Sequence, residues 1–391
     1  GEAGELKTKI TAEYDGMVRY DFVLTPRAGT EVDRLELRLP VRKDASEISY
    51  ITDRSDGEVY AVWNPEVFAQ AGKETTGQIK GAATEYPWVI YAWQGTADVG
   101  LGAVVDSDEA WDTLGRKDAF RVEATPEART MVWSFAKATW KLPSPWRFTI
   151  GVQPTPAKPP RPALRHLRYG KPEWLPNANF YIYCLWPAIQ PYFGYPGTQA
   201  PDALKKAVDD YREQGVALLP YTLLTNFATD APEYTFYLKK YRCPMVKEIP
   251  CADWGPNAAY LPLSPSDEVI DFLVWKHHEY VSTFGYGGLY HDLSVPYPSS
   301  NEAAGFGYVR DGVRRPTYPV FAMRNQYRRI YTMLKALEQE RKQPMTSVLH
   351  IPPYAWLSSF GDFAWVGEGI KVDYRKSVTP AKMRILAGNG L

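Results

Sequence analysis

Polar and apolar residues alternate in short runs over the first 155 residues, and turn residues separate the runs. The runs at 7–14 and 17–25 are joined by Asp15-Gly16, a dipeptide typical of a two-residue hairpin turn. Alternation with a period of two indicates strands that bury one face. Because many short strands follow one another with few helical stretches between them, the pattern favours an antiparallel β-sandwich over residues 1–155.

The pattern changes after a Pro-rich linker at 156–175, and apolar strands then alternate with amphipathic helices over residues 176–391. This alternation indicates a parallel sheet and predicts a (β/α)8-like (TIM) barrel, so the expected fold is multidomain, β followed by α/β. About six strand positions can be counted where eight are needed. The barrel is therefore irregular or the sequence is cut short, and a start at Gly1 without Met also suggests a processed or partial chain. Strands are predicted at 179–187, 216–226, 257–265, 287–294, 345–353 and 363–370, and helices at 201–215, 266–285 and 318–340.

Two carboxylates occupy places where barrel enzymes keep catalytic groups, at the C-terminal ends of strands. Asp292 leaves the strand "GGLY", and Glu368 lies between glycines in "FAWVGEGI". Glycoside hydrolysis needs such a pair, one as the acid and the other as a nucleophile, base or cation stabiliser. The aromatic neighbours of Glu368 favour it as the acid. The alternatives for Asp292 are a helix cap or an ion pair with an arginine, and for Glu368 a salt bridge.

Further candidates at the strand ends and in the loops are aromatic, amide, imidazole and carboxylate groups, which together suit a carbohydrate cleft. Each of them is also compatible with a purely structural role. The candidates for substrate contact are Trp186, Tyr192, Asn226, Trp254, His291, Asn301, His350, Trp356 and Asp362.

The composition of the chain limits the classes of binding partner that the sequence supports. Lys plus Arg equals Asp plus Glu, at 45 each, so net charge favours neither nucleic acid nor an anionic membrane. No apolar run approaches the roughly 18–20 residues that span a bilayer. No histidine or cysteine set has metal-site spacing and no nucleotide-binding motif occurs, so no metal or cofactor is expected. Cys184, Cys243 and Cys251 are interpreted as structural thiols, with a Cys243–Cys251 bridge as the alternative in an exported protein.

Six blocks stand out along the chain, in this order: "EYDGMVRYDFVLTP", "GLGAVVDSDEAWD", "GVQPTPAKP", "GLYHDLSVPYPSSNEAAGFGYVRDG", "MRNQYRRIYTMLK" and "SFGDFAWVGEGI". With these blocks the chain resembles a bacterial glycoside-hydrolase-like family of the DUF6067 type, which is related to glycoside hydrolase family 123. The resemblance implies a β-sandwich followed by a catalytic barrel, a polysaccharide or glycan substrate, and an extracellular or periplasmic location. Family 123 uses an adjacent Asp-Glu pair, which reads Asp292-Leu293 here, so only Asp292 and Glu368 carry over. Arg324 lies in a family block and is expected to orient a carboxylate.

The sequence thus predicts a glycosidase with carbohydrate as its partner, and it leaves the oligomeric state, including a homo-oligomer, open. Two other readings stay open because a fold does not determine a function. One is a non-catalytic carbohydrate-binding protein that keeps the barrel as a scaffold. The other is a structural or assembly protein of the cell surface.

Overall fold

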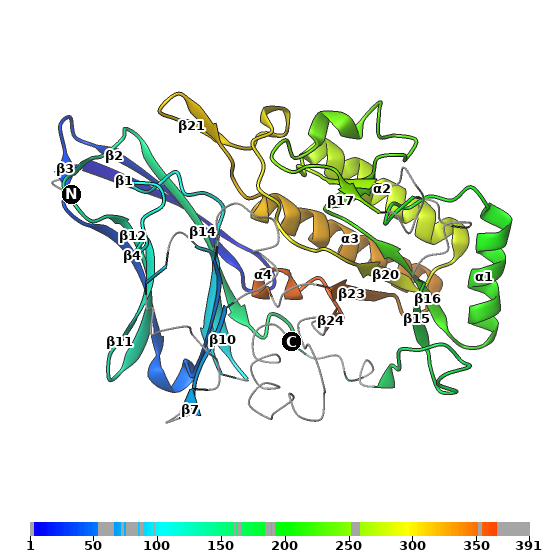
Figure 1. The fold of residues 1–391 in the computed structure, drawn as a ribbon. Helices are drawn as coiled ribbons and strands as arrows, with labels where there is room; N and C mark the ends of the chain where they lie inside the picture. The colour runs from blue at the N-terminus through cyan, green and yellow to red at the C-terminus, as the bar shows by residue number, and fades with distance from the viewer. Residues whose placement is uncertain are drawn as a thin grey trace.

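The computed structural model describes an antiparallel β region followed by a helix-covered parallel sheet (Figure 1). No helix in the described ranges is long and apolar enough to cross a membrane. The structure describes residues 4–53, 66–71, 74–75, 85–86, 89–96, 98–159, 162, 166–183, 189, 192–251, 259–350 and 354–365.

The N-terminal region forms two main antiparallel sheets. Its first hairpin turns at Asp15-Gly16 as predicted, because Gly16 adopts a φ of 87° that favours glycine. The larger sheet has the strand order β1 (Gly4–Ala12), β2 (Val18–Pro26), β14 (Trp146–Thr155), β10 (Gly100–Val105), β9 (Val89–Gly95), β5 (Ile48–Asp53), β6 (Glu66–Ala71), β7 (Glu74–Thr75). The smaller sheet has the order β4 (Leu35–Arg42), β12 (Ala128–Ala136), β11 (Phe120–Ala124), β8 (Glu85–Tyr86), and β3 (Glu31–Val32) pairs with β13 (Trp140–Lys141).

The two sheets pack face to face through aromatic side chains. Phe135 of the smaller sheet lies 4.6 Å from Phe148 and 5.1 Å from Trp146 of the larger one, measured between ring centroids. Trp111 adds edge contacts to both phenylalanines. Such rings bury large apolar areas at favourable edge-to-face angles, so they hold the β-sandwich that the alternating pattern predicts.

The second region is built on five parallel strands whose spatial order follows the chain. Sequential order with helices on one face is the arrangement of a barrel, whereas a doubly wound sheet reverses its order and carries helices on both faces. Figure 1 shows α1, α2 and α3 along one side of these strands. The complete eight-stranded barrel stays a prediction. The strands are β15 (Phe180–Tyr183), β16 (Ala217–Thr222), β20 (Gly288–His291), β23 (Thr346–His350) and β24 (Phe363–Trp365), and the helices are α1 (Pro201–Glu213), α2 (Asp267–Phe284), α3 (Val320–Arg341) and α4 (Ala355–Ser358).

Local sequence signals predicted the first residues of α1 and α2 correctly. Pro201 opens α1, and the Ser266 side chain accepts a hydrogen bond from the amide of Val269 to cap α2, as predicted. The predicted strand at 257–265 is real but was placed wrongly in the barrel. Its described part, β19 (Ala259–Pro262), pairs antiparallel with β17 (Asn226–Ala228) and β18 (Ile249–Pro250). A buried apolar run has the same pattern in either kind of sheet. A further hairpin joins β21 (Tyr308–Arg310) to β22 (Val313–Arg315).

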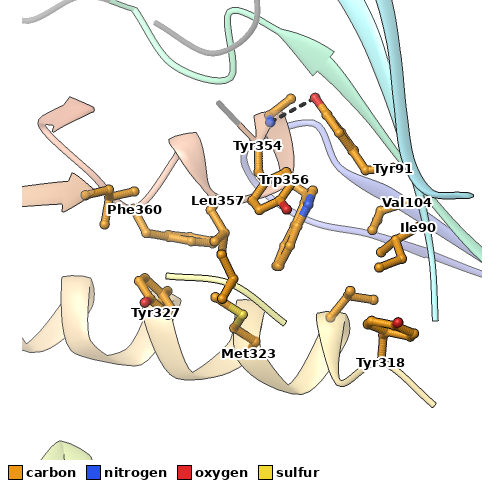
Figure 2. Close-up of a cluster of buried hydrophobic side chains, with 14 of the residues drawn as sticks. Ile90, Tyr91, Val104, Tyr318, Met323, Tyr327, Tyr354, Trp356, Leu357 and Phe360 are labelled. Carbon is orange, nitrogen blue, oxygen red and sulfur yellow. Dashed lines mark hydrogen bonds between the residues drawn. The ribbon is translucent and has the colours of Figure 1, made fainter. Parts of the chain in front are cut away.

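The two regions share one hydrophobic core (Figure 2). Tyr91 of β9 accepts a hydrogen bond from the amide of Ala355 in α4 at 3.0 Å, and its ring meets that of Tyr354 edge-on. On α3, Arg324 is 2% exposed and binds the Asp15 carboxylate at the tip of the first hairpin at 2.7 Å. β14 ends at Thr155 and β15 begins at Phe180, while the domain boundaries themselves stay a prediction.

Candidate functional site

Polar and aromatic side chains gather at the carboxyl ends of β16, β20 and β23, on the face turned away from α1, α2 and α3. Tyr221 and Tyr290 sit beside each other in register on neighbouring strands. Asp292 follows Tyr290 by two residues and His350 ends β23. Because side chains two apart on a strand point to the same face, the alternation brings these groups together.

The Asp292 carboxylate accepts hydrogen bonds on both oxygens. Its Oδ2 accepts from the Tyr221 hydroxyl, and its Oδ1 accepts from the Leu293 amide at 2.8 Å. The Nδ1 atom of His350 lies 2.7 Å from the same Oδ1. The Asp292 side chain is 15% exposed, so it is held in place and still reaches solvent.

Leu293 adopts a φ of 50°, in the left-handed region that β-branched and bulky residues rarely enter. This conformation turns its amide onto the Asp292 carboxylate. The backbone is fixed on both sides: the Asp292 amide donates to the Thr222 carbonyl at 2.9 Å, and Thr225 Oγ1 donates to the Leu293 carbonyl at 2.8 Å. Strain of about 1–3 kcal/mol at a non-glycine residue persists where the surroundings impose it, often beside functional groups.

His350 connects Asp292 to Tyr290. Its Nδ1 atom lies 2.6 Å from the Tyr290 hydroxyl and 2.7 Å from Asp292 Oδ1. A lone pair on Nδ1 would face the carboxylate oxygen and repel it, so Nδ1 carries the hydrogen and donates to Asp292.

Aromatic rings border this group on both sides. Phe193 lies 5.5 Å from Tyr221 and 5.2 Å from Tyr260, and Trp365 lies 6.2 Å from Tyr290, all between ring centroids. Phe193 and Trp365 are half-buried, so the core does not fully enclose either residue. Flat apolar rings beside oriented hydrogen-bonding groups suit a sugar, whose faces are apolar and whose edges are polar.

Tyr221 and Tyr290 were missed in the sequence, although a signal for them exists. Each occupies the inward-facing position just before a strand ends, two residues before Leu223 and Asp292 respectively. A period-two count back from Asp292 reaches Tyr290 directly. To predict Tyr221 one must also know the register in which β16 pairs with β20, and the sequence around Tyr221 does not contain that information.

Four predicted contact residues are built into the core. His291 is 1% exposed, its Nδ1 lies 3.0 Å from Thr222 Oγ1, and burial holds its pKa well below its usual range. Trp356 is 1% exposed in the core shared by the two regions. Asp362, with a fully buried side chain, accepts from Tyr331, Lys335 and the Ser347 amide. Arg324 does bind a carboxylate, as expected, but this carboxylate is the buried one of Asp15 and not a group of the site. We therefore assign these four to packing and do not carry them into the site.

Of the predicted residues not yet placed, three lie elsewhere in the described structure and three lie outside the described residues. Tyr192 packs against Tyr195 in a separate core cluster, and Asn301 caps a short helix while donating to the Lys240 and Arg242 carbonyls. Asn226 is 1% exposed and begins β17, whereas the preceding strand ends at Thr222, so its predicted place at a barrel strand end was wrong. Glu368, Trp186 and Trp254 lie outside the described residues.

Among the described residues, no three His, Cys, Asp or Glu side chains are placed to hold a metal ion. No disulfide joins Cys243 to Cys251, so the alternative of a bridge between them is not realised. Burial raises the pKa of Cys243 to about 12, and its sulfur lies 3.5 Å from Ser264 Oγ. Such a thiol behaves as a packing group. Cys184 lies outside the described residues.

Comparison with known proteins finds likeness in structure alone. No family model and no curated protein sequence matches the chain. Among solved structures, α-N-acetylgalactosaminidase NagBb from Bifidobacterium bifidum is 11% identical with a TM-score of 0.38, over 99% of this chain and 71% of that one. The α-galactosidase TtGalA from Thermus thermophilus is 12% identical with a TM-score of 0.39, over 97% and 92%. A GH31 sulfoquinovosidase from E. rectale is 12% identical with a TM-score of 0.43, over 93% and 57%. These neighbours carry glycosidase names, but scores this low do not establish a shared fold, and the site is interpreted from its own geometry.

Proposed function

We propose that this protein is a glycoside hydrolase acting on a polysaccharide or glycan, with Asp292 as one of its two catalytic carboxylates. The observation that carries the proposal is the Asp292 carboxylate itself. It lies at the end of a parallel strand, accepts from Tyr221, His350 and the Leu293 amide, and is bordered by half-buried aromatic residues. Catalytic groups in barrel enzymes occupy this edge of the sheet.

The hydrogen bonds favour one role for Asp292. Both of its oxygens accept, so it is arranged as a nucleophile, a base or a stabiliser of the positive charge that develops at the sugar. The proton donor to the leaving oxygen is then the second carboxylate, for which Glu368 is our candidate from the sequence. The Tyr221 and His350 donors fix the direction of the Asp292 oxygens, which is the positioning that such a reaction requires.

The proposal is tested by a glycan-library hydrolysis screen of the wild-type protein beside Asp292→Asn and Glu368→Gln variants. Asp271→Asn is the matched control, because this carboxylate is 67% exposed on α2 and its ion pair among the described residues is with a surface arginine, Arg329. We expect both site variants to lose roughly 100-fold or more in rate, and the control to keep wild-type activity. Circular dichroism and thermal melting show whether each variant is folded.

The possible outcomes separate the competing functions. Sugar release that survives Asp292→Asn in a folded protein contradicts the proposed site. Glycans that bind without being cleaved by wild type indicate a carbohydrate-binding protein instead. Where cleavage occurs, the anomeric form of the first product distinguishes retention from inversion.

A further inference from the structure

A pocket outside the Asp292 group lies where the sandwich meets the β21–β22 hairpin. Its volume is about 260 Å³. The sandwich contributes Trp140 and Lys141 of β13 and Arg147 of β14, and the hairpin contributes Tyr308 and Arg310. Figure 1 shows this hairpin reaching out beside β14. The pocket shares no residue with the Asp292 group.

The hairpin wall of the pocket is fixed by hydrogen bonds to the loop after β10, which contributes the lining residue Glu109. The Tyr308 hydroxyl donates to the Asp108 carboxylate at 2.9 Å. Arg310 Nη2 donates to the Asp112 carbonyl at 2.6 Å. Both bonds join the hairpin to the loop after β10, so the pocket is formed before any ligand arrives, and little ordering cost remains for binding.

The side chains that line the pocket carry a net positive charge. Three cations, Lys141, Arg147 and Arg310, line it together with one carboxylate, Glu109. Burial raises the pKa of Glu109, and the charges of Arg147 and Arg310 oppose that rise, which places both guanidinium groups within electrostatic reach of the pocket wall. In the described part of the chain, the side chains of Lys141 and Arg147 make no hydrogen bond or ion pair, and the buried Arg310 Nη1 atom has no hydrogen-bond partner. These donors suit an anion.

The remaining lining argues for more than a bare ion. The Trp140 indole is half-buried and Tyr308 is 8% exposed, so aromatic surface lies beside the cations. Aromatic faces bind the apolar face of a sugar ring. The volume lies below the roughly 300–1,000 Å³ of sites for drug-sized ligands, which fits a single ring with its acidic group.

We propose that this pocket binds a negatively charged sugar unit, carboxylated or sulfated, of a polysaccharide. Arg147 and Lys141 would bind the acidic group and Trp140 would lie against the ring. The choice of a sugar rests on the proposed glycosidase function, while the choice of an anion rests on the cations alone. The pocket would then hold an acidic substrate chain at a distance from the point of cleavage.

Binding is measured by calorimetry on the full chain carrying Asp292→Asn, which prevents turnover. The probes are oligogalacturonides for the carboxylate, carrageenan oligosaccharides, which carry sulfate and no carboxylate, for the sulfate, galacto-oligosaccharides as the neutral set, and sodium acetate and sodium sulfate as free anions. Arg147→Ala and Trp140→Ala test the two halves of the pocket. Arg42→Ala is the control, because Arg42 is an exposed arginine on the smaller sheet whose ion pair in the described ranges is with the nearby surface residue Asp44.

We expect at least one acidic oligosaccharide to bind more tightly than the neutral set, and to lose about tenfold or more in affinity in Arg147→Ala and in Trp140→Ala. Arg42→Ala should bind like the parent, and the affinity should fall with added salt. The acidic probe that binds tells carboxylate from sulfate.

The proposal is overturned if no acidic oligosaccharide exceeds the neutral set, or if both pocket variants bind like the parent. If free acetate or sulfate binds as tightly as the oligosaccharide and Trp140→Ala has no effect, the pocket is a plain anion site and the sugar part is wrong. If the wild type hydrolyses glycans but binding does not depend on Arg147, the pocket proposal is rejected and the glycosidase function is kept. Arg147-dependent binding without hydrolysis removes the glycosidase function and leaves the pocket.

Discussion

The buried pair of Arg324 and Asp15 offers a sharp test of how the two regions are held together. Arg324 Nη2 lies 2.7 Å from both Asp15 oxygens, and its Nη1 donates to the Trp356 carbonyl at 2.5 Å. The side chains of Arg324 and Asp15 are each 2% exposed. Replacing Arg324 by Met keeps most of the apolar volume and removes the charge, which leaves the Asp15 carboxylate with Ser359 Oγ and the Met17 amide.

Breaking a buried pair from one side costs about 3–5 kcal/mol, because the other charge stays buried without compensation. We therefore expect Arg324→Met to lower the free energy of unfolding by that amount. Arg329→Met is the matched control on the same helix. Arg329 pairs with Asp271 at 2.5 Å, but these side chains are 37% and 67% exposed, so the expected loss is below about 1 kcal/mol.

The assay is urea denaturation at pH 7, with the midpoint and slope recorded for both variants and for Arg324→Met combined with Asp15→Asn. The double variant should recover a large part of the loss, since it removes the unpaired charge. An Arg324→Met protein within about 1 kcal/mol of wild type at an unchanged slope would refute the reasoning.

The pH dependence gives a second reading of the same pair. Burial alone would raise the pKa of Asp15, but the charge and hydrogen bonds of Arg324 outweigh it, and the pKa is lowered. The pair's contribution to stability is thus present above the ordinary aspartate pKa of about 3.8 and is lost as the pH falls through the lower folded value. In Arg324→Met this acid-side loss of stability should shrink, because only the hydrogen bonds from Ser359 and Met17 then oppose the effect of burial on the Asp15 pKa.

Three further predictions follow from single residues. Burial lowers the pKa of His277 to about 4, so the folded protein resists the proton that the unfolded chain accepts near pH 6.5. Stability should therefore fall by about 3 kcal/mol between pH 6.5 and 4, and urea midpoints at pH 7 and 4.5 should show a smaller drop in His277→Gln. Equal drops in the two proteins would contradict this. Gly288 has a φ of 151°, and an added Cβ would lie 1.9 Å from the Thr346 carbonyl oxygen. Gly288→Ala should thus cost more than about 3 kcal/mol, against about 1 for Gly312→Ala, which has open space at a φ of 73°; similar melting temperatures would count against the argument. Tyr221→Phe removes one donor to the Asp292 carboxylate, so the rate of glycan cleavage should fall about tenfold with little change in melting temperature, and an unchanged rate would remove Tyr221 from the site.

Features that depend on neighbours in the chain were predictable. The Asp15-Gly16 turn and the Ser266 cap both follow from what those residues do within a few positions. The carboxylate at the end of β20 was also predictable, because barrel strands carry their functional groups where they end.

Features that depend on distant partners were not predictable. Arg324 was expected to orient a carboxylate, yet its partner Asp15 stands 309 positions away. The direction of β19 was misjudged because a buried apolar run looks alike in parallel and antiparallel sheets. His291 and Asp292 are adjacent in the sequence but point to opposite faces of the sheet. The His291 side chain therefore lies in the core, and the Asp292 side chain lies in the site.

The core shared by β9, β10, α3 and α4 also limits how this architecture can change by recombination. A domain that folds alone can be exchanged between proteins as a module, because few contacts cross its boundary. Here Tyr91 anchors the start of α4, and Arg324 anchors the first hairpin. A foreign sandwich would have to bring an equivalent hairpin tip and an equivalent tyrosine. The sandwich and the parallel sheet are therefore expected to have been inherited together, as one evolutionary unit.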